Sequence, residues 1–174
     1  MQVYKILSLL LEYPKAELRE HWDEIKNLIP QLPLTSDEDQ QALLDFMGWA
    51  SALSLTEYQA HYVNTFDFTP DNALYLTHHL FEEQDRERGP ALVDLSDYYK
   101  AEGFEISEGE LPDYLPLVLE YVSTLTTEID VRLFLQQSSH VSDIIAKNLE
   151  KINSPYAPLL RVVQRHGRLV DIAA

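Results

Sequence analysis

The chain has 174 residues and no cysteine, and its 13 Lys and Arg residues stand against 29 Asp and Glu residues, a formal net charge of −16. This charge argues against nucleic acid and anionic membrane surfaces as partners, because both bind basic faces, and it favours a basic peptide. The absence of cysteine excludes a disulfide framework and a cysteine-ligated metal, and it fits a reducing, cytoplasmic setting.

Apolar residues recur at helical spacing along the first half of the chain. Residues 3–11 and 18–29 each carry an apolar stripe that a proline ends. Ser36 and Ser54 are each followed three residues later by an acid, the signal of a capping box. These signals predict two further helices, with apolar faces formed by Leu43, Met47 and Ala50 and by Tyr58, Tyr62 and Phe66.

The second half continues the helical pattern after a turn-rich break over residues 67–72. We expect a helix over residues 74–82, an interruption at Gly89-Pro90, and a helix over residues 92–99 that Gly103 ends in a left-handed conformation. Further helices are expected over residues 115–125 and 141–152 and from Pro155 through Leu169.

No segment shows the sustained alternation or the hairpin turn that indicates a strand. The sequence therefore predicts an all-α helical bundle of about eight or nine helices in a single domain, 1–174. It contains neither a signal-peptide pattern nor the run of about 18 apolar residues that a membrane span requires, so we expect no direct membrane insertion.

The heptapeptide Glu110-Leu111-Pro112-Asp113-Tyr114-Leu115-Pro116 places two carboxyl groups and two prolines at the expected start of a long helix. Proline is tolerated in a first helical turn, and acids are stabilised there by the helix dipole. The heptapeptide is therefore either a well-capped helix start or a rigid acidic lip that faces a cationic partner.

Phe66-Asp67-Phe68 places a carboxyl group between two aromatic rings where a helix is expected to end. Aromatic residues at helical spacing usually belong to a core. This arrangement also suits a groove that combines apolar pockets with a charge, as in the recognition of helical peptides.

His78 and His79 each stand four residues before a glutamate, so each pair shares a helix face and offers possible metal ligands. The sequence marks no further ligands, and it lacks a phosphate-binding loop, G-x-S-x-G and H-E-x-x-H. We therefore expect no metal and no enzyme; a metal-dependent hydrolase using His78, His79 and Glu82 is the open alternative.

Several ordered motifs resemble the NarJ family, the assembly chaperones of respiratory nitrate reductase that are also called its delta subunits. This family belongs to an all-helical group with the TorD and DmsD chaperones. The matching segments are Tyr62-Val63-Asn64-Thr65-Phe66-Asp67-Phe68, Leu74-Tyr75-Leu76-Thr77-His78, Arg88-Gly89-Pro90-Ala91-Leu92, and the heptapeptide followed by Leu119-Glu120-Tyr121.

The resemblance implies a cytoplasmic chaperone that binds the N-terminal segment of the reductase catalytic subunit. Such a chaperone assists insertion of molybdopterin guanine dinucleotide before membrane docking, and it holds no cofactor stably itself. The chain would be a monomer or a homodimer. A chaperone of another molybdoenzyme and a structural subunit that stays in the mature enzyme are the other readings.

The resemblance also implies a peptide groove. Asp67, Glu110 and Asp113 would pair with Arg or Lys of the peptide, and aromatic rings with Leu115 would take its apolar face. The implied groove residues are Tyr62, Phe66, Asp67, Phe68, His78, Glu82, Glu110, Asp113, Tyr114, Leu115 and Glu120.

Overall fold

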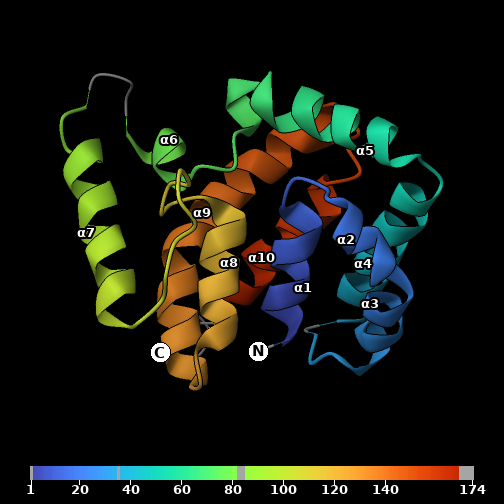
Figure 1. Cartoon of the computed structure of the whole chain (residues 1–174), viewed down its shortest axis with the longest axis horizontal. Helices are drawn as coiled ribbons and strands as arrows, with labels where there is room; N and C mark the ends of the chain where they lie inside the picture. Colours follow the sequence, from blue (N-terminus) through green and yellow to red (C-terminus); the bar gives the residue numbers. More distant parts are fainter. Residues whose placement is uncertain (1, 35, 82–84, 169–174) are drawn as a thin grey trace.

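The computed structural model describes residues 2–34, 36–81 and 85–168, and over these residues the chain forms ten α-helices and no strand. This result confirms the predicted all-α class (Figure 1). Two helices have only five residues, which explains why the count exceeds the expected eight or nine. The helices are α1 (Gln2–Leu11), α2 (Ala16–Glu20), α3 (Trp22–Leu28), α4 (Asp37–Ser51), α5 (Leu55–Tyr62), α6 (Leu76–Leu80), α7 (Arg88–Ala101), α8 (Leu115–Thr124), α9 (Glu128–Lys151) and α10 (Ala157–Arg168).

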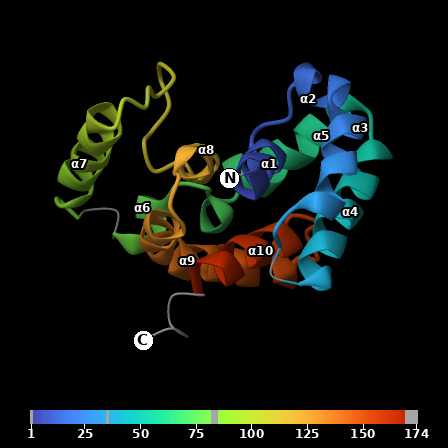
Figure 2. The same ribbon diagram turned by 90° about the horizontal axis from the view of Figure 1, so that it is seen from below.

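The pair α9 and α10 forms one layer, and α1 packs beside α8 on one side of it (Figures 1 and 2). Helix α4 contacts α10 at one end of the molecule, and α7 stands at the opposite end. The apolar stripe predicted in residues 3–11 faces this core, because Leu7, Leu10 and Leu11 are fully buried. No helix in the described parts of the chain is long and apolar enough to cross a bilayer.

The predicted helix over residues 18–29 is divided in two at His21, whose backbone is not helical. Both halves are anchored to the end of α4. Arg19 donates hydrogen bonds to the carbonyl oxygens of Ala50 and Leu53, each at 2.8 Å, and the Trp22 indole donates to the Ser51 hydroxyl at 2.6 Å. These tertiary contacts outweigh the local pattern that favoured one continuous helix.

Both predicted helix caps are present. The Ser54 hydroxyl accepts a hydrogen bond from the Glu57 amide while Glu57 binds back to the Ser54 amide, a complete capping box at the start of α5. Ser36 accepts a hydrogen bond from the Asp39 amide at the start of α4. The Asp39 carboxyl group, fully buried, forms an ion pair with Arg165 of α10 and thereby links the two helices.

The helix predicted over residues 74–82 is limited to α6, because Tyr75 instead pairs with Tyr114 in an isolated antiparallel bridge. The Leu76 amide donates to the Asp113 carbonyl at 3.0 Å, and the Leu115 amide donates to the Leu74 carbonyl at 2.8 Å. We call this pairing the Tyr75–Tyr114 bridge. It fixes the entry of the chain into α8.

Four other predictions have mixed outcomes. Gly89 and Pro90 lie within the first turn of α7, which begins at Arg88, because proline fits the first helical turn. Gly103 follows α7 with a φ of +74°, which confirms the left-handed cap. Helix α9 begins at Glu128, well before the predicted stripe, and Leu169 lies outside the described residues.

Candidate functional site

Two adjoining hollows open beside the Tyr75–Tyr114 bridge, with volumes of about 510 and 310 Å³. They adjoin because Glu110 and Tyr114 line both of them. We call the combined surface the acidic groove. The first hollow is lined by Tyr13, Tyr62, Phe66, Asp67, Pro70, Ala73, Leu74, Tyr75, His78, Glu110 and Tyr114, and the second by Ser8, Glu12, Lys15, Ser107, Glu108, Gly109, Glu110, Tyr114, Pro116, Leu117 and Glu120.

Aromatic rings form one wall of the acidic groove. The Tyr62 and Tyr114 hydroxyl groups are hydrogen-bonded at 2.7 Å, and the Tyr75 ring lies 5.3 Å from the Tyr114 ring. The Tyr13 ring meets the Tyr62 ring edge to face at 5.6 Å. Such contacts hold large side chains in fixed positions, so the wall is preorganised for an apolar ligand.

A π-helical turn at the end of α5, over Val63–Asp67, brings Phe66 and Asp67 to the groove. The Phe68 amide donates to the Val63 carbonyl at 3.0 Å, which is the i→i−5 bond of this turn. The Thr65 hydroxyl donates to the His61 carbonyl at 2.7 Å and stabilises the preceding turn. The wider turn changes the direction in which the last residues of the helix point.

The acids of the groove fall into two groups. Glu12 and Glu120 form ion pairs with Lys15 and Lys5. In the described structure Asp67, Glu108 and Glu110 form no ion pair. These three carboxyl groups are therefore the ones available to a cationic ligand.

Burial shifts the pKa of several ionisable groups of the groove, Asp67 and Tyr75 among them. It raises the pKa of the Asp67 carboxyl group above its ordinary value. Burial, together with the charge of Glu110, raises the pKa of Tyr75 to about 12. The Tyr75 hydroxyl accordingly stays protonated and donates to Glu110 Oε1 at 3.3 Å, while the Leu111 amide donates to the same oxygen at 2.9 Å.

Most of the residues that the sequence implied for a groove are brought together here. The first hollow contains six of them, and Glu120 lines the second. Glu82 lies outside the described residues. The six are Tyr62, Phe66, Asp67, His78, Glu110 and Tyr114.

Three implied residues do not line the acidic groove. Leu115 is fully buried in the core, and Phe68 is 76% exposed outside the lining of the groove. Asp113 is buried and accepts hydrogen bonds from the amide and hydroxyl of Thr77. We expected the Asp113 carboxyl group to stabilise the start of the following helix. This expectation is wrong, because the carboxyl group instead accepts hydrogen bonds at the start of α6.

Sequence reasoning missed Glu12, Tyr13 and Tyr75 as groove residues. Tyr75 was expected within the helix predicted over residues 74–82. Glu12 and Tyr13 follow α1, about fifty positions before the other rings, and no local pattern marks them. Their place in the groove depends on the packing of α1 beside α8.

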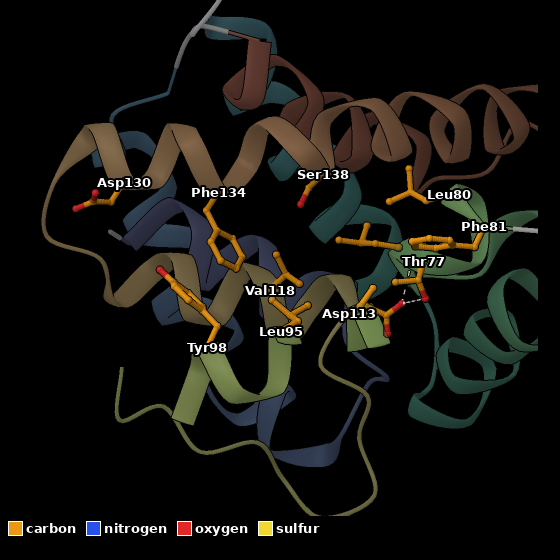
Figure 3. A pocket seen from close by; sticks show the side chains of 12 residues that line it. Thr77, Leu80, Phe81, Leu95, Tyr98, Asp113, Val118, Asp130, Phe134 and Ser138 are labelled. Carbon is orange, nitrogen blue, oxygen red and sulfur yellow. Dashed lines mark hydrogen bonds between the residues drawn. The ribbon is translucent and has the colours of Figure 1, made fainter. Parts of the chain in front are cut away.

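A third hollow, which we call the α7 cleft, lies between α6, α7, α8 and α9 (Figure 3). It has a volume of about 470 Å³. It is lined by Leu76, Thr77, Leu80, Phe81, Ala91, Leu95, Tyr98, Asp113, Val118, Asp130, Phe134 and Ser138.

The two histidines considered as metal ligands have other contacts. The His78 and His79 rings meet edge to face at 5.2 Å, and a ring nitrogen of His79 lies 2.7 Å from the Ala73 carbonyl oxygen. Among the residues that the structure describes, no group of three His, Asp or Glu side chains is placed to hold a metal ion.

Comparison with known proteins adds a family to this geometry. Residues 13–161 match the family described as nitrate reductase delta subunit. The chain belongs to this family. The match includes every described residue that lines the acidic groove except Ser8 and Glu12. The family is the one that the sequence motifs indicated, so that prediction is confirmed.

Individual members of the delta subunit family are similar along most of the chain. A probable nitrate reductase molybdenum cofactor assembly chaperone, NarJ of Bacillus subtilis, is 38% identical over 92% of this chain and 85% of its own length. NarJ of Escherichia coli K12 is 34% identical over 88% of this chain and 64% of its own length. The chain thus spans less than two thirds of that second relative.

A third relative, the probable assembly chaperone NarW of Escherichia coli K12, is 38% identical over 72% of this chain and 51% of its own length. The delta subunit family is one of assembly chaperones rather than enzymes, which confirms the prediction that the chain is not an enzyme.

Proposed function

We propose that this chain is a cytoplasmic assembly chaperone that binds the N-terminal segment of a nitrate reductase catalytic subunit in the acidic groove. It holds that subunit ready for insertion of the molybdenum cofactor before membrane docking. Membership of the delta subunit family supports nitrate reductase as the client, and the names of the relatives support a role in assembly of the molybdenum cofactor. In this proposal molybdopterin guanine dinucleotide belongs to the client.

The observation that carries the proposal is one groove that combines an aromatic wall with acids that form no ion pair among the described residues. An apolar side chain of the peptide gains about 1.5–3 kcal/mol when fully covered. An exposed charge pair with Glu110 or Asp67 adds about 0.2–1 kcal/mol. Apolar anchors therefore set most of the affinity, and the acids set the orientation of a basic peptide and speed its association.

Calorimetry with a synthetic peptide of the catalytic subunit's N-terminus tests this proposal. We expect saturable binding to the wild-type chain and a loss of about 1.4- to 5-fold in affinity for Glu110→Gln, because one charge pair is removed. Asp45→Asn is the matched control, since Asp45 is exposed on α4 and contacts Gln41 outside the groove. Absence of binding across salt concentrations, or equal losses in both variants, contradicts the proposal.

The identity of the client is a separate question, because a chaperone of another molybdoenzyme would have a similar groove. Affinity purification followed by mass spectrometry of the bound client distinguishes the two. Recovery of the nitrate reductase catalytic subunit without its cofactor supports the proposal. Recovery of a different molybdoenzyme contradicts the client, and recovery with active, membrane-bound reductase favours a permanent structural subunit.

A further inference from the structure

A further hollow, which we call the α1–α3 groove, opens between α1 and the short helices α2 and α3. Helix α1 lies between α8 and these two helices in both views (Figures 1 and 2). The hollow has a volume of about 550 Å³, within the usual range of about 300–1,000 Å³ for ligand sites. The function proposed above does not use it.

Apolar side chains from three helices line the α1–α3 groove. Ile6 and Leu9 of α1 are three residues apart, as are Ile25 and Leu28 of α3, so each pair lies on one face of its helix. Leu18 of α2 completes the apolar lining. A groove whose walls are apolar helix faces is the kind that receives the apolar face of a further helix.

The α1–α3 groove adjoins the acidic groove directly. Tyr13 lines both the α1–α3 groove and the first hollow of the acidic groove, and its ring contacts the Tyr62 ring edge to face at 5.6 Å. Glu12 and Lys15 line both the α1–α3 groove and the second hollow. A polypeptide bound in the acidic groove therefore has the α1–α3 groove as a neighbouring surface.

The two surfaces differ in charge. In the α1–α3 groove three glutamates stand against two lysines, and Glu12 is paired with Lys15. Among the described residues that line the acidic groove, five acids stand against Lys15. The five are Glu12, Asp67, Glu108, Glu110 and Glu120. The acidic groove thus favours a cation, whereas the nearly balanced α1–α3 groove favours a neutral, apolar surface.

We propose that the α1–α3 groove binds a neutral amphipathic helix of the client, next in sequence to the basic segment that occupies the acidic groove. The apolar face of this helix covers Leu9 and Leu28, which are half-buried, and Tyr13, which is 39% exposed. The inference rests on the proposed function and extends it, because it divides the client segment into a basic part and an apolar part with separate sites.

Calorimetry of the full chain with two synthetic peptides of the catalytic subunit's N-terminus tests the α1–α3 groove. The short peptide ends after the basic segment, and the long peptide adds the next three helical turns, about 11 residues. We expect the long peptide to bind at least about tenfold more tightly, because it covers further apolar side chains. Salt should weaken both peptides by the same factor, since the added contacts are apolar.

A matched pair of variants locates this gain in affinity. Leu9→Gln places an amide in the apolar lining without changing the charge. It should reduce the advantage of the long peptide to less than about twofold and leave the affinity of the short peptide unchanged. Ile152→Gln is the control, because Ile152 is 59% exposed after α9 and lines neither the α1–α3 groove nor the acidic groove.

A fluorescent label gives a second readout that does not depend on the folding of Leu9→Gln. The chain has no cysteine, so His21→Cys can carry a single environment-sensitive dye at the edge of the α1–α3 groove. The His21 side chain is 65% exposed, which leaves room for the dye. The long peptide should shift its emission to shorter wavelength, and the short peptide should leave it unchanged.

The outcomes separate this inference from the proposed function. Equal affinities of the two peptides, equal losses in Leu9→Gln and Ile152→Gln, or unchanged emission with the long peptide overturn the inference. In each of these cases binding of the short peptide still supports the chaperone assignment. Failure of both peptides to bind overturns the proposed function and the inference together.

Discussion

Asp67 combines two properties that bear on the binding of a cation. It lies at the end of the π-helical turn, where it lines the acidic groove without an ion pair in the described structure. Partial burial nevertheless raises the pKa of its carboxyl group. A cationic ligand therefore meets a carboxylate whose charge is less well hydrated than that of a free side chain, and acid removes this charge earlier than usual.

This residue predicts the pH dependence of peptide binding. Affinity for a basic peptide should fall on acidification from neutral pH, and the fall should begin above the ordinary Asp pKa of about 3.9 because the pKa of Asp67 is raised. In Asp67→Asn the decline should move to lower pH. Calorimetry over this range is the measurement, and identical pH profiles for the two proteins would contradict the role of Asp67.

At the scale of elements, α9 and α10 approach each other closely where Gly167 faces Ser139. A Cβ atom on Gly167 would lie 2.7 Å from Ser139 Cβ and 2.9 Å from the Leu135 carbonyl oxygen, both shorter than real contacts. The absence of a side chain thus sets the distance between the two helices. Gly48, in the interior of α4, has nothing within 4 Å of the same position.

The two glycines form a matched pair of substitutions. Gly167→Ala should destabilise the protein by about 1–3 kcal/mol, because the helices must move apart. Gly48→Ala should stabilise it by about 0.5–1 kcal/mol, because alanine loses less backbone freedom in a helix. Urea denaturation gives both free energies of unfolding. Equal effects of the two substitutions would show that the close approach of α9 and α10 does not affect the free energy of unfolding.

Features that depend on neighbouring residues could be predicted from the sequence, and features that depend on distant contacts could not. The Ser54–Glu57 capping box and the apolar stripe of α1 depend on neighbouring residues, and both are present as predicted. The division between α2 and α3 depends on hydrogen bonds from Arg19 and Trp22 to the end of α4. Local spacing carries no information about such contacts, so the break could not be predicted.

The residues predicted for the groove show the same distinction between local and distant signals. Tyr62, Phe66 and Asp67 belong to one short segment and could be chosen from its pattern. Asp113 stands next to Tyr114 in an equally clear motif, yet its side chain lies on the other side of the bridge. A motif can locate a site in the sequence, whereas the direction of each side chain follows from the backbone conformation of the segment.

At the scale of the molecule, α10 connects the N-terminal helices through a buried polar cluster. A nitrogen of the His166 ring lies 3.0 Å from the Tyr4 hydroxyl of α1, and its other nitrogen lies 3.9 Å from the Asp39 carboxyl group of α4. Arg165 forms an ion pair with the same carboxyl group. Burial lowers the pKa of His166 despite the opposing charge of Asp39.

This cluster predicts a loss of stability in mild acid. The unfolded chain protonates His166 near the ordinary histidine pKa of about 6.5, whereas the folded protein resists protonation. Below that pH the unfolded state binds more protons, so the free energy of unfolding should fall, with a contribution of up to about 1.4 kcal/mol per pH unit. His166→Asn, which retains an acceptor for Tyr4, should have a shallower decline in denaturation curves. An equal slope in the variant would exclude His166 as the cause.

A turn over Pro112 and Asp113, closed by a hydrogen bond from the Tyr114 amide to the Leu111 carbonyl, leads into the Tyr75–Tyr114 bridge, and on either side of this junction Tyr114 lines the acidic groove while Asp113 lines the α7 cleft. The acidic groove and the α7 cleft therefore share one wall, and adjacent residues of that wall line different cavities. The backbone of this short junction, as much as the composition of either cavity, decides which side chain each cavity presents.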